Sequence, residues 1–197
     1  YINAGLYEKA ESDILRYLEG FPADMDALFN LATSYTGRDM SDEALEVYFK
    51  LVEVDLDGVF ARRNNLYNNI GSTFSGLGDF EKAIYYFKKQ IEEQVEFDFT
   101  AYLNLYGVYI HLESYEIAVE VLLKALKLKP NSQEVLSKLG NHYFDVNQLE
   151  ESIVFYERAL LQKKQPEFFF YIATAHMRLG NKEKALLNYI KAEDLDI

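Results

Sequence analysis

Residues 67–87 read YNNIGSTFSGLGDFEKAIYYF. Within this segment Gly71 and Phe74 precede a turn that contains Gly76 and Gly78, and the small residue Ala83 follows the turn. Small residues allow two helix backbones to approach within about 8–10 Å, and large rings fill the space around them. The segment therefore predicts two antiparallel helices joined by a short turn.

The same pattern recurs along the chain. A small residue follows a turn six times, at spacings of 34, 39, 35, 34 and 33 residues: Ala10, Ala44, Ala83, Ala118, Ser152 and Ala185. A large apolar residue stands four positions later in each copy: Ile14, Tyr48, Phe87, Leu122, Tyr156 and Tyr189. One such hairpin cannot bury its apolar face alone, so we expect neighbouring copies to stack.

These positions resemble the tetratricopeptide repeat family, whose pattern is W-x2-L-G-x2-Y, then A-x3-F, then P. The matching residues in one copy are Tyr67, Ile70, Gly71, Phe74, Ala83 and Phe87. No copy has Trp at the first position, and Tyr106 replaces the small residue of its repeat, so either the two helices there pack further apart or Gly107 takes up that role. The resemblance covers essentially the whole chain. It implies an all-α, right-handed superhelical solenoid of antiparallel helix pairs.

We expect one solenoid domain over residues 1–197, with a half repeat at 1–22 and repeats at about 25–58, 64–97, 99–132, 133–165 and 166–197. The expected helices are 6–20, 25–37, 41–54, 60–76, 80–94, 99–112, 115–128, 133–146, 149–163, 167–179 and 182–194. The extra residues at Val59–Arg63 should lengthen the helix 60–76 or its approach loop. Neither end carries a polar capping helix, so we expect more repeats, a partner or a second copy to cover the ends.

Composition excludes several classes of function. The 197 residues include 32 Asp and Glu against 20 Lys and Arg, a net charge of −12, which disfavours nucleic acid and anionic membrane surfaces as partners. No apolar run approaches the roughly 20 residues that span a bilayer. The chain has no cysteine, so disulfides, zinc–thiolate sites and cysteine nucleophiles are excluded.

Nothing in the sequence predicts a catalytic centre. The histidines His111, His142 and His176 have no HxxxH or HExxH spacing, and His176 stands at a ring position where a packed core histidine is expected. The glycines near residue 76 lack the Lys-Ser/Thr ending of a phosphate-binding loop. We therefore expect no cofactor, no metal and no enzymatic activity.

The first helix of each pair should line a concave surface. One position on these helices holds Asn30, Asn69, Asn104, Lys138 and Tyr171. An Asn amide offers both donors and an acceptor, which match the main chain of an extended peptide. The three Asn resemble the asparagine ladder in the repeat domain of the O-linked N-acetylglucosamine transferase, although Asn on a polar helix face would also explain them. Neighbouring groove candidates are Asn68, Asn141, Phe29 and Phe170.

The Lys, Asn and Arg set of a two-carboxylate clamp is absent, because its positions hold Phe29, Thr33, Asn69, Thr100 and Asn104. An acidic C-terminal tail is therefore a disfavoured ligand. The sequence predicts a module that holds an extended peptide or a helix of a partner protein in its groove. Two alternatives stay open: a repeat arm of a larger enzyme or regulatory protein, and a scaffold that self-associates through its uncapped ends.

Overall fold

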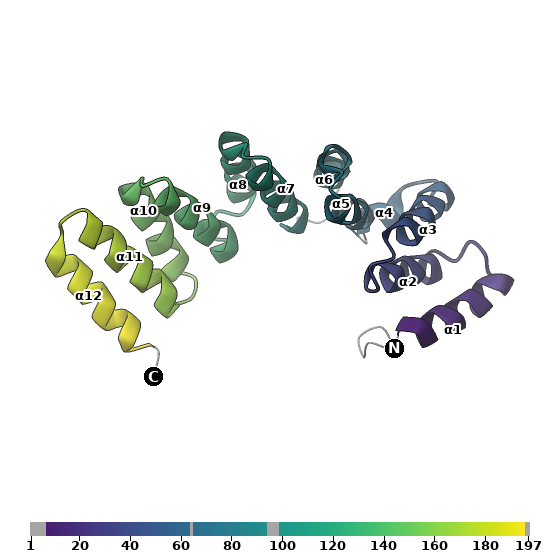
Figure 1. The fold of residues 1–197 in the computed structure, drawn as a ribbon, viewed down its shortest axis with the longest axis horizontal. Helices are drawn as coiled ribbons and strands as arrows, with labels where there is room; N and C mark the ends of the chain where they lie inside the picture. The colour runs from purple at the N-terminus through teal and green to yellow at the C-terminus, as the bar shows by residue number, and fades with distance from the viewer. Residues whose placement is uncertain (1–6, 64, 94–98, 196–197) are drawn as a thin grey trace. The chain divides into compact units, whose positions relative to one another are not determined.

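The chain folds into helices alone over the part that the structure describes. The computed structural model describes residues 7–63, 65–93 and 99–195, which form twelve helices and no strand (Figure 1). The chain divides into two compact units, residues 1–112 and 113–197. The predicted all-α architecture is confirmed, while the predicted repeat boundaries within one domain stay a prediction.

Within each unit the helices pack against their neighbours in sequence. Unit 1 contains α1 (Tyr7–Gly20), α2 (Met25–Thr36), α3 (Ser41–Val54), α4 (Val59–Arg63), α5 (Leu66–Gly76), α6 (Phe80–Glu93) and α7 (Thr100–His111). Unit 2 contains α8 (Tyr115–Leu128), α9 (Gln133–Asp145), α10 (Leu149–Leu160), α11 (Pro166–Arg178) and α12 (Lys182–Glu193). The pairs α2–α3, α5–α6, α9–α10 and α11–α12 are the predicted hairpins.

Two of the predicted helices differ from the structure by more than one residue at an end. The expected helix 149–163 stops at Leu160. The expected helix 60–76 is wrong, because the extra residues form the separate five-residue helix α4 and the chain breaks before α5. Asn65 precedes α5 in the left-handed conformation, with φ of 53°, which ends a right-handed helix.

Two buried polar side chains bond to the chain at the starts of α4 and α5. Asp55 is 7% exposed, and its carboxylate accepts hydrogen bonds from the backbone N–H of Phe60 at 3.1 Å and of Ala61 at 2.7 Å. Gln90, 1% exposed on α6, donates to Oδ1 of Asn65 at 3.1 Å and accepts from the N–H of Asn68 at 3.3 Å. Side chains from other segments therefore accept hydrogen bonds from backbone N–H groups at the start of each helix, which have no partner within the helix.

The turn between the two helices of a pair has the same backbone form in every copy. One residue with positive φ stands five positions before the small residue: Asp39, Gly78, Glu113, Asn147 and Gly180, with φ from 56° to 79°. Only glycine adopts this conformation without a steric cost, so the three acidic or amide residues keep it because the flanking helices require it.

The small residues occupy the positions that the repeat predicts. Ala44, Ala83, Ala118, Ser152 and Ala185 are completely buried. A Cβ atom at Gly71 would lie 2.8 Å from the ring of Phe87, and one at Gly140 would lie 2.8 Å from the ring of Tyr156. These two glycines therefore permit the close contact between paired helices. The side chain of Ala10 lies outside the described residues.

The suggestion that Gly107 replaces the missing small residue of its repeat is wrong. A Cβ atom built at Gly107 would meet no atom within 4 Å, and the residue is exposed on α7. Gly107 therefore opens space at the surface and does not bring two backbones together.

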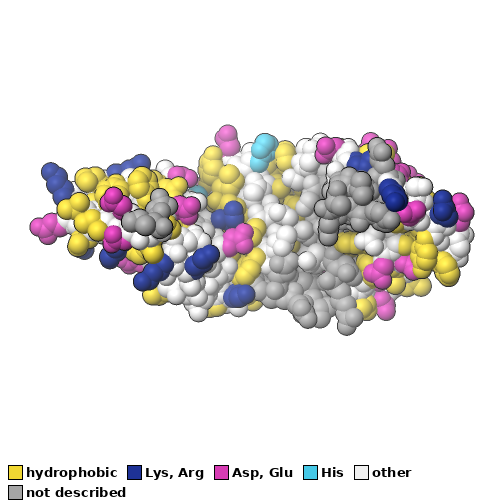
Figure 2. Space-filling view, turned by 90° about the horizontal axis from the view of Figure 1, so that it is seen from below, with side chains coloured by type: hydrophobic (Ala, Val, Ile, Leu, Met, Phe, Trp, Pro, Cys, Tyr) yellow, Lys and Arg dark blue, Asp and Glu magenta, His cyan; other side chains and the backbone are white. Residues whose placement is uncertain are grey.

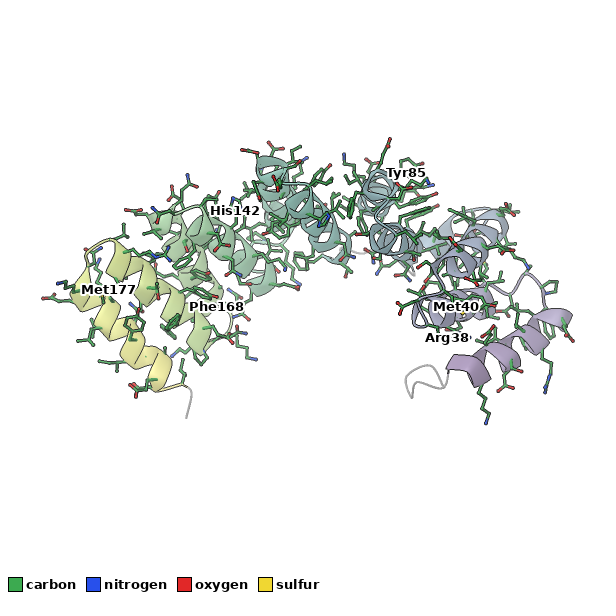
Figure 3. The ribbon with its side chains drawn as sticks, viewed as in Figure 1. Arg38, Met40, Tyr85, His142, Phe168 and Met177 are labelled. Carbon is green, nitrogen blue, oxygen red and sulfur yellow. The ribbon has the colours of Figure 1, made fainter. Side chains whose placement is uncertain are left out.

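Rings fill the remaining volume between the packed helices in both units. In unit 1 the ring of Tyr86 stacks on Phe74 at 5.7 Å and on Tyr67 at 6.4 Å, while Tyr85 projects outward with 59% of its surface exposed (Figure 3). In unit 2 the ring of Phe168 lies 5.7 Å from that of Tyr156 (Figure 3). These contacts fix the faces on which the candidate binding residues lie.

Candidate functional site

The candidate binding residues of unit 1 lie on α2, α5 and α7, the first helices of their pairs. We call the exposed and half-buried positions of these three helices the first-helix face. The helices carry Asp26 and His111 as their only ionisable side chains apart from tyrosine, and no Lys or Arg. The surface they offer is therefore almost uncharged and cannot bind a carboxylate through a cation.

Asn104 forms side-chain hydrogen bonds to another first helix. Its side-chain amide donates to Oδ1 of Asn68 at 2.9 Å and to Oγ of Ser72 at 3.3 Å, and both acceptors belong to the preceding first helix, α5. The two hydrogens of the amide are thereby used. The carbonyl oxygen of Asn104 is the group that can still accept a hydrogen bond from a ligand.

Asn68 accepts a hydrogen bond from Asn104 and has little exposed surface of its own. It is 6% exposed, and its backbone N–H is held by Gln90, the same residue that fixes Asn65. Hydrogen bonds therefore link the amide groups of Asn65, Gln90, Asn68 and Asn104, from the interruption before α5 to the first-helix face. A partner would contact this set chiefly through Asn104.

The other two members of the predicted ladder differ from Asn104. Asn69 is half-buried, and its side chain forms a hydrogen bond with the hydroxyl of Tyr48. Burial raises the pKa of Tyr48, which the hydrogen bonds from Thr36 and Asn69 partly oppose. Asn30 is exposed on α2. The three amides thus share a position in the repeat but differ in exposure and in their partners.

Phe29 packs mainly against its own unit. Its ring lies 6.3 Å from that of Tyr48 and 5.9 Å from that of Phe60, and the residue is half-buried. Only part of this side chain is available to a partner.

A hollow of about 500 Å³ lies between α5, α6 and α7. Its lining residues are Ser72, Ser75, Phe80, Phe87, Leu103, Asn104, Gly107, Val108 and His111. The sequence did not single out Phe80 or His111 for this site, although the ring of His111 lies 4.5 Å from that of Phe80, tilted by 42°. The open position at Gly107 was the available signal, because a glycine on the surface of a helix leaves room for a ligand.

Unit 2 carries the remaining predicted residues on α9 and α11. Lys138 is half-buried, and Asn141 is exposed and accepts a 2.5 Å hydrogen bond from the hydroxyl of Tyr156. The hydroxyl of Tyr189 lies 3.2 Å from Oγ1 of Thr174 in the same way. The hydroxyl groups of these tyrosines on second helices therefore bond to polar side chains on the first helices.

Phe170 is 52% exposed and borders a second hollow, of about 590 Å³, between α11 and α12. Pro166, Glu167, Tyr171, Tyr189, Ala192 and Glu193 complete its lining. The ring of Phe170 lies 5.6 Å from that of Tyr189, so the exposed aromatic side chain packs against α12. Among the predicted residues of unit 2, Phe170 offers the largest apolar surface to a ligand.

His176 is buried, as the ring position predicts. The hydrogen bond expected of a core histidine is absent at Nδ1, which is buried with no partner among the described residues. Burial, followed by the nearby charge of Lys184, lowers its pKa, so the ring is neutral in the folded chain at neutral pH.

The described residues contain no cluster of His, Asp or Glu that could hold a metal ion. Over the same residues, no helix has the length and apolar character needed to cross a bilayer. Charge is unevenly divided: residues 1–112 contain 19 acidic and 9 basic residues, whereas residues 113–197 contain 13 and 11. In the face shown in Figure 2, Lys and Arg side chains are spread over the C-terminal unit at the left.

Residues 65–94 and 100–132 match the tetratricopeptide repeat. The chain is similar to the tetratricopeptide repeat family over these two segments. The matched segments cover α5 with α6 and α7 with α8, and the same positions continue through the other hairpins. Stacked repeats of this kind form extended concave surfaces that are suited to binding.

Solved structures share the fold over most of the chain. The chain is 21% identical to YrrB, which is described as a TPR protein with an unusual peptide-binding site; the TM-score is 0.64, over 92% of this chain and 91% of that one. A crystal structure of MamA gives a TM-score of 0.68 at 19% identity, over 86% and 90% of the two chains. PilF of Pseudomonas aeruginosa gives 0.72 at 18% identity, over 99% and 86%. At these identities the similarity establishes the fold.

Two relatives are similar in sequence. Outer dynein arm-docking complex subunit 4 of Danio rerio is 23% identical over 199 residues, which cover 93% of this chain and 41% of that protein. A TPR repeat-containing protein of Methanocaldococcus jannaschii is 29% identical over 90 residues, which cover 45% of this chain and 28% of that protein. The matched regions are less than half of the length of each relative.

Proposed function

We propose that the chain binds an extended segment of a partner protein on its first-helix face and thereby acts as an adaptor. The observation that carries this proposal is the hollow between α5 and α7, which Asn104 borders. A hollow of about 500 Å³ with an apolar floor and a few polar groups at its rim is typical of a binding site.

The amide positions support the same function. Asn30, Asn69 and Asn104 occupy one position on α2, α5 and α7, and repeated first helices present such positions at regular intervals. An extended peptide offers N–H and C=O groups at regular intervals as well. The peptide-binding site described for YrrB, which shares this fold, is a further reason to propose a peptide ligand.

Unit 2 would contribute Lys138, Asn141 and Phe170 to binding in the same manner. Phe170 supplies an exposed ring, and Asn141 is an exposed amide that already accepts from Tyr156. We expect moderate affinity, because a flexible peptide loses conformational freedom when it is ordered on a surface.

A double substitution tests the proposal. Asn69→Ala with Asn104→Ala removes two amides of the first-helix face, and the bound proteins are compared with those of the unchanged chain by affinity capture and mass spectrometry. Asn188→Ala is the matched control, since its amide bonds only to the carbonyl of Lys184 on its own helix α12. Retention of every partner by the double variant, with an unchanged circular dichroism spectrum, would show that these two amides do not contribute to binding.

A repeat arm of a larger protein is a second candidate. The chain matches only 41% and 28% of the lengths of its two relatives, so such repeats occur as parts of longer proteins. The coding sequence on either side of this segment tests this candidate directly. An adjoining catalytic domain would favour it, and stop codons on both sides would exclude it.

Self-association is a third candidate, favoured by the exposed apolar surface of α12. Leu186, Leu187 and Ile190 are 61%, 58% and 46% exposed. Analytical ultracentrifugation at high concentration tests this, with Leu187→Glu as the disrupting variant. Leu161→Glu is the control, because Leu161 is 82% exposed but follows α10 instead of lying on α12. A monomer at every concentration would exclude self-association.

A further inference from the structure

We infer that the hollow beside Gly107 selects the partner of unit 1: it takes one large uncharged side chain from an extended segment that carries net positive charge. This inference rests on the proposed function and adds the chemistry of the ligand to it. Its elements are the space at Gly107, the uncharged lining, the hydrogen-bond polarity of Asn104 and the charge of the unit.

Gly107 creates the space. The equivalent positions on the other first helices carry the side chains of Thr33, Ser72, Asn141 and Thr174. Three of these four side chains form hydrogen bonds to their own helix or to a tyrosine of the second helix, and Ser72 accepts from Asn104. At Gly107 no side chain exists, and a Cβ atom there would meet nothing within 4 Å. Of the five first helices, α7 alone is open at this position.

The lining of the hollow favours an apolar occupant. Phe87 and Val108, which are 1% and 4% exposed, form its floor, and the adjoining, mutually tilted rings of Phe80 and His111 form one wall. Among the residues that the structure describes, no Asp, Glu, Lys or Arg lines it. A charged side chain would lose hydration without gaining a partner of opposite charge, whereas a large aliphatic or aromatic side chain gains from burial.

The rim of the hollow accepts hydrogen bonds. Both amide hydrogens of Asn104 are donated to Asn68 and Ser72, which leaves the carbonyl oxygen as its available group. A main-chain N–H of an extended segment matches this oxygen. The segment would thus place one N–H on Asn104 and the adjoining side chain in the space beside Gly107.

The charge of unit 1 determines the sign of the partner. Residues 1–112 carry a net charge of −10, from 19 acidic and 9 basic residues, and the three first helices carry no Lys or Arg. Such a field raises the association rate of basic segments and repels acidic ones. The Lys and Arg residues of the partner would flank the uncharged side chain and stay in solvent.

The test begins with random linear peptides displayed on phage and selected on the chain. We expect enriched peptides to share net positive charge and one aromatic or large aliphatic position. A synthetic peptide from this set is then titrated by fluorescence anisotropy against the unchanged chain and against Gly107→Leu, whose side chain fills the hollow. Loss of one buried apolar side chain predicts affinity weaker by about 10- to 100-fold.

Three controls make the result specific. Gly20→Leu introduces the same side chain at an open glycine at the end of α1, away from the hollow, and should bind as the unchanged chain does. Gly107→Ala, a smaller obstruction, should weaken binding less than Gly107→Leu. Replacing the conserved uncharged residue of the peptide by Ala should weaken binding to the unchanged chain and have little further effect on Gly107→Leu.

The possible outcomes separate the two proposals. Enriched acidic peptides, or equal affinity of Gly107→Leu and the unchanged chain, would overturn the inference about the hollow. If those same peptides still lost affinity on Asn69→Ala with Asn104→Ala, the proposed function would stand. Failure of any peptide to be enriched would contradict the proposed function itself.

Discussion

Replacing Gly71 with Ala puts a methyl group where paired helices touch. The new Cβ atom would lie 2.8 Å from two carbons of the Phe87 ring and 3.2 Å from the backbone oxygen of Ala83. Carbon atoms pack best at about 3.5–4.0 Å, so the ring must move, yet Phe87 is only 1% exposed. The backbone oxygen cannot move without shifting α6.

Two opposing effects set the size of the change. Overpacking of a buried site costs about 1–3 kcal/mol, and Ala in place of Gly within a helix returns about 1 kcal/mol. Gly107→Ala, in the same unit, isolates the second effect, because the new methyl group meets nothing within 4 Å. We therefore expect Gly71→Ala to lie about 1–3 kcal/mol below Gly107→Ala in free energy of unfolding, and up to about 2 kcal/mol below the unchanged chain.

Urea unfolding followed by circular dichroism measures both variants. For a chain of this length each kcal/mol corresponds to a shift of about 2–4 °C in Tm, which provides an independent reading. If Gly71→Ala were as stable as Gly107→Ala, the close contact between α5 and α6 would not exist as described. Gly140→Ala, against the ring of Tyr156, should repeat the effect in unit 2.

Three further substitutions test other features. Glu113→Gly relieves a positive φ that costs a side chain about 1–2 kcal/mol, so its Tm should rise; an unchanged Tm would show that the turn is unstrained. Burial and Lys184 lower the pKa of His176, so the folded chain binds fewer protons than the unfolded chain does, and the stability present above about pH 6.5 falls on acidification. His176→Gln should flatten this pH dependence in urea titrations at several pH values. An equal pH dependence in the variant and the unchanged chain would contradict the role of His176. Asp55→Ala removes both buried hydrogen bonds at the start of α4 and should cost about 1–3 kcal/mol, more than Asp57→Ala at the exposed neighbouring position; equal losses in urea would refute the buried cap.

The repeated hairpin could be predicted from sequence because its signal is local and periodic. The burial of Ala44, Ala83 and Ala118 follows from a spacing of about 34 residues and from small residues placed after turns. Such a signal depends on neighbours within one hairpin, which the sequence displays directly.

The break before α5 could not be predicted in this way. Gln90, which bonds to Asn65 at the break, lies 25 residues beyond it, and Asp55 caps the start of the inserted helix α4. Neither side chain differs from an ordinary surface residue when the sequence is read alone. Only the fold brings these polar groups to the buried positions where they satisfy the interrupted backbone.

The amide positions show a similar limit. Asn30, Asn69 and Asn104 have the same place in the repeat, so the sequence treats them as equal members of a ladder. In the structure Asn30 is exposed, Asn69 bonds to Tyr48, and Asn104 bonds to Asn68 and Ser72. Hydrogen-bond partners contributed by other helices decide which atom of each amide faces a ligand, and periodicity does not record them.

The short helix α4 adds residues at the joint between two hairpins and leaves both hairpins intact. Asp55 at the end of α3 and Gln90 on α6 bind the backbone around this joint, so the added length does not disturb the helix pairs on either side. An array built in this manner can acquire a new distance between successive recognition positions by insertion at a joint. Ligand spacing can then evolve separately from the packing that keeps the array folded.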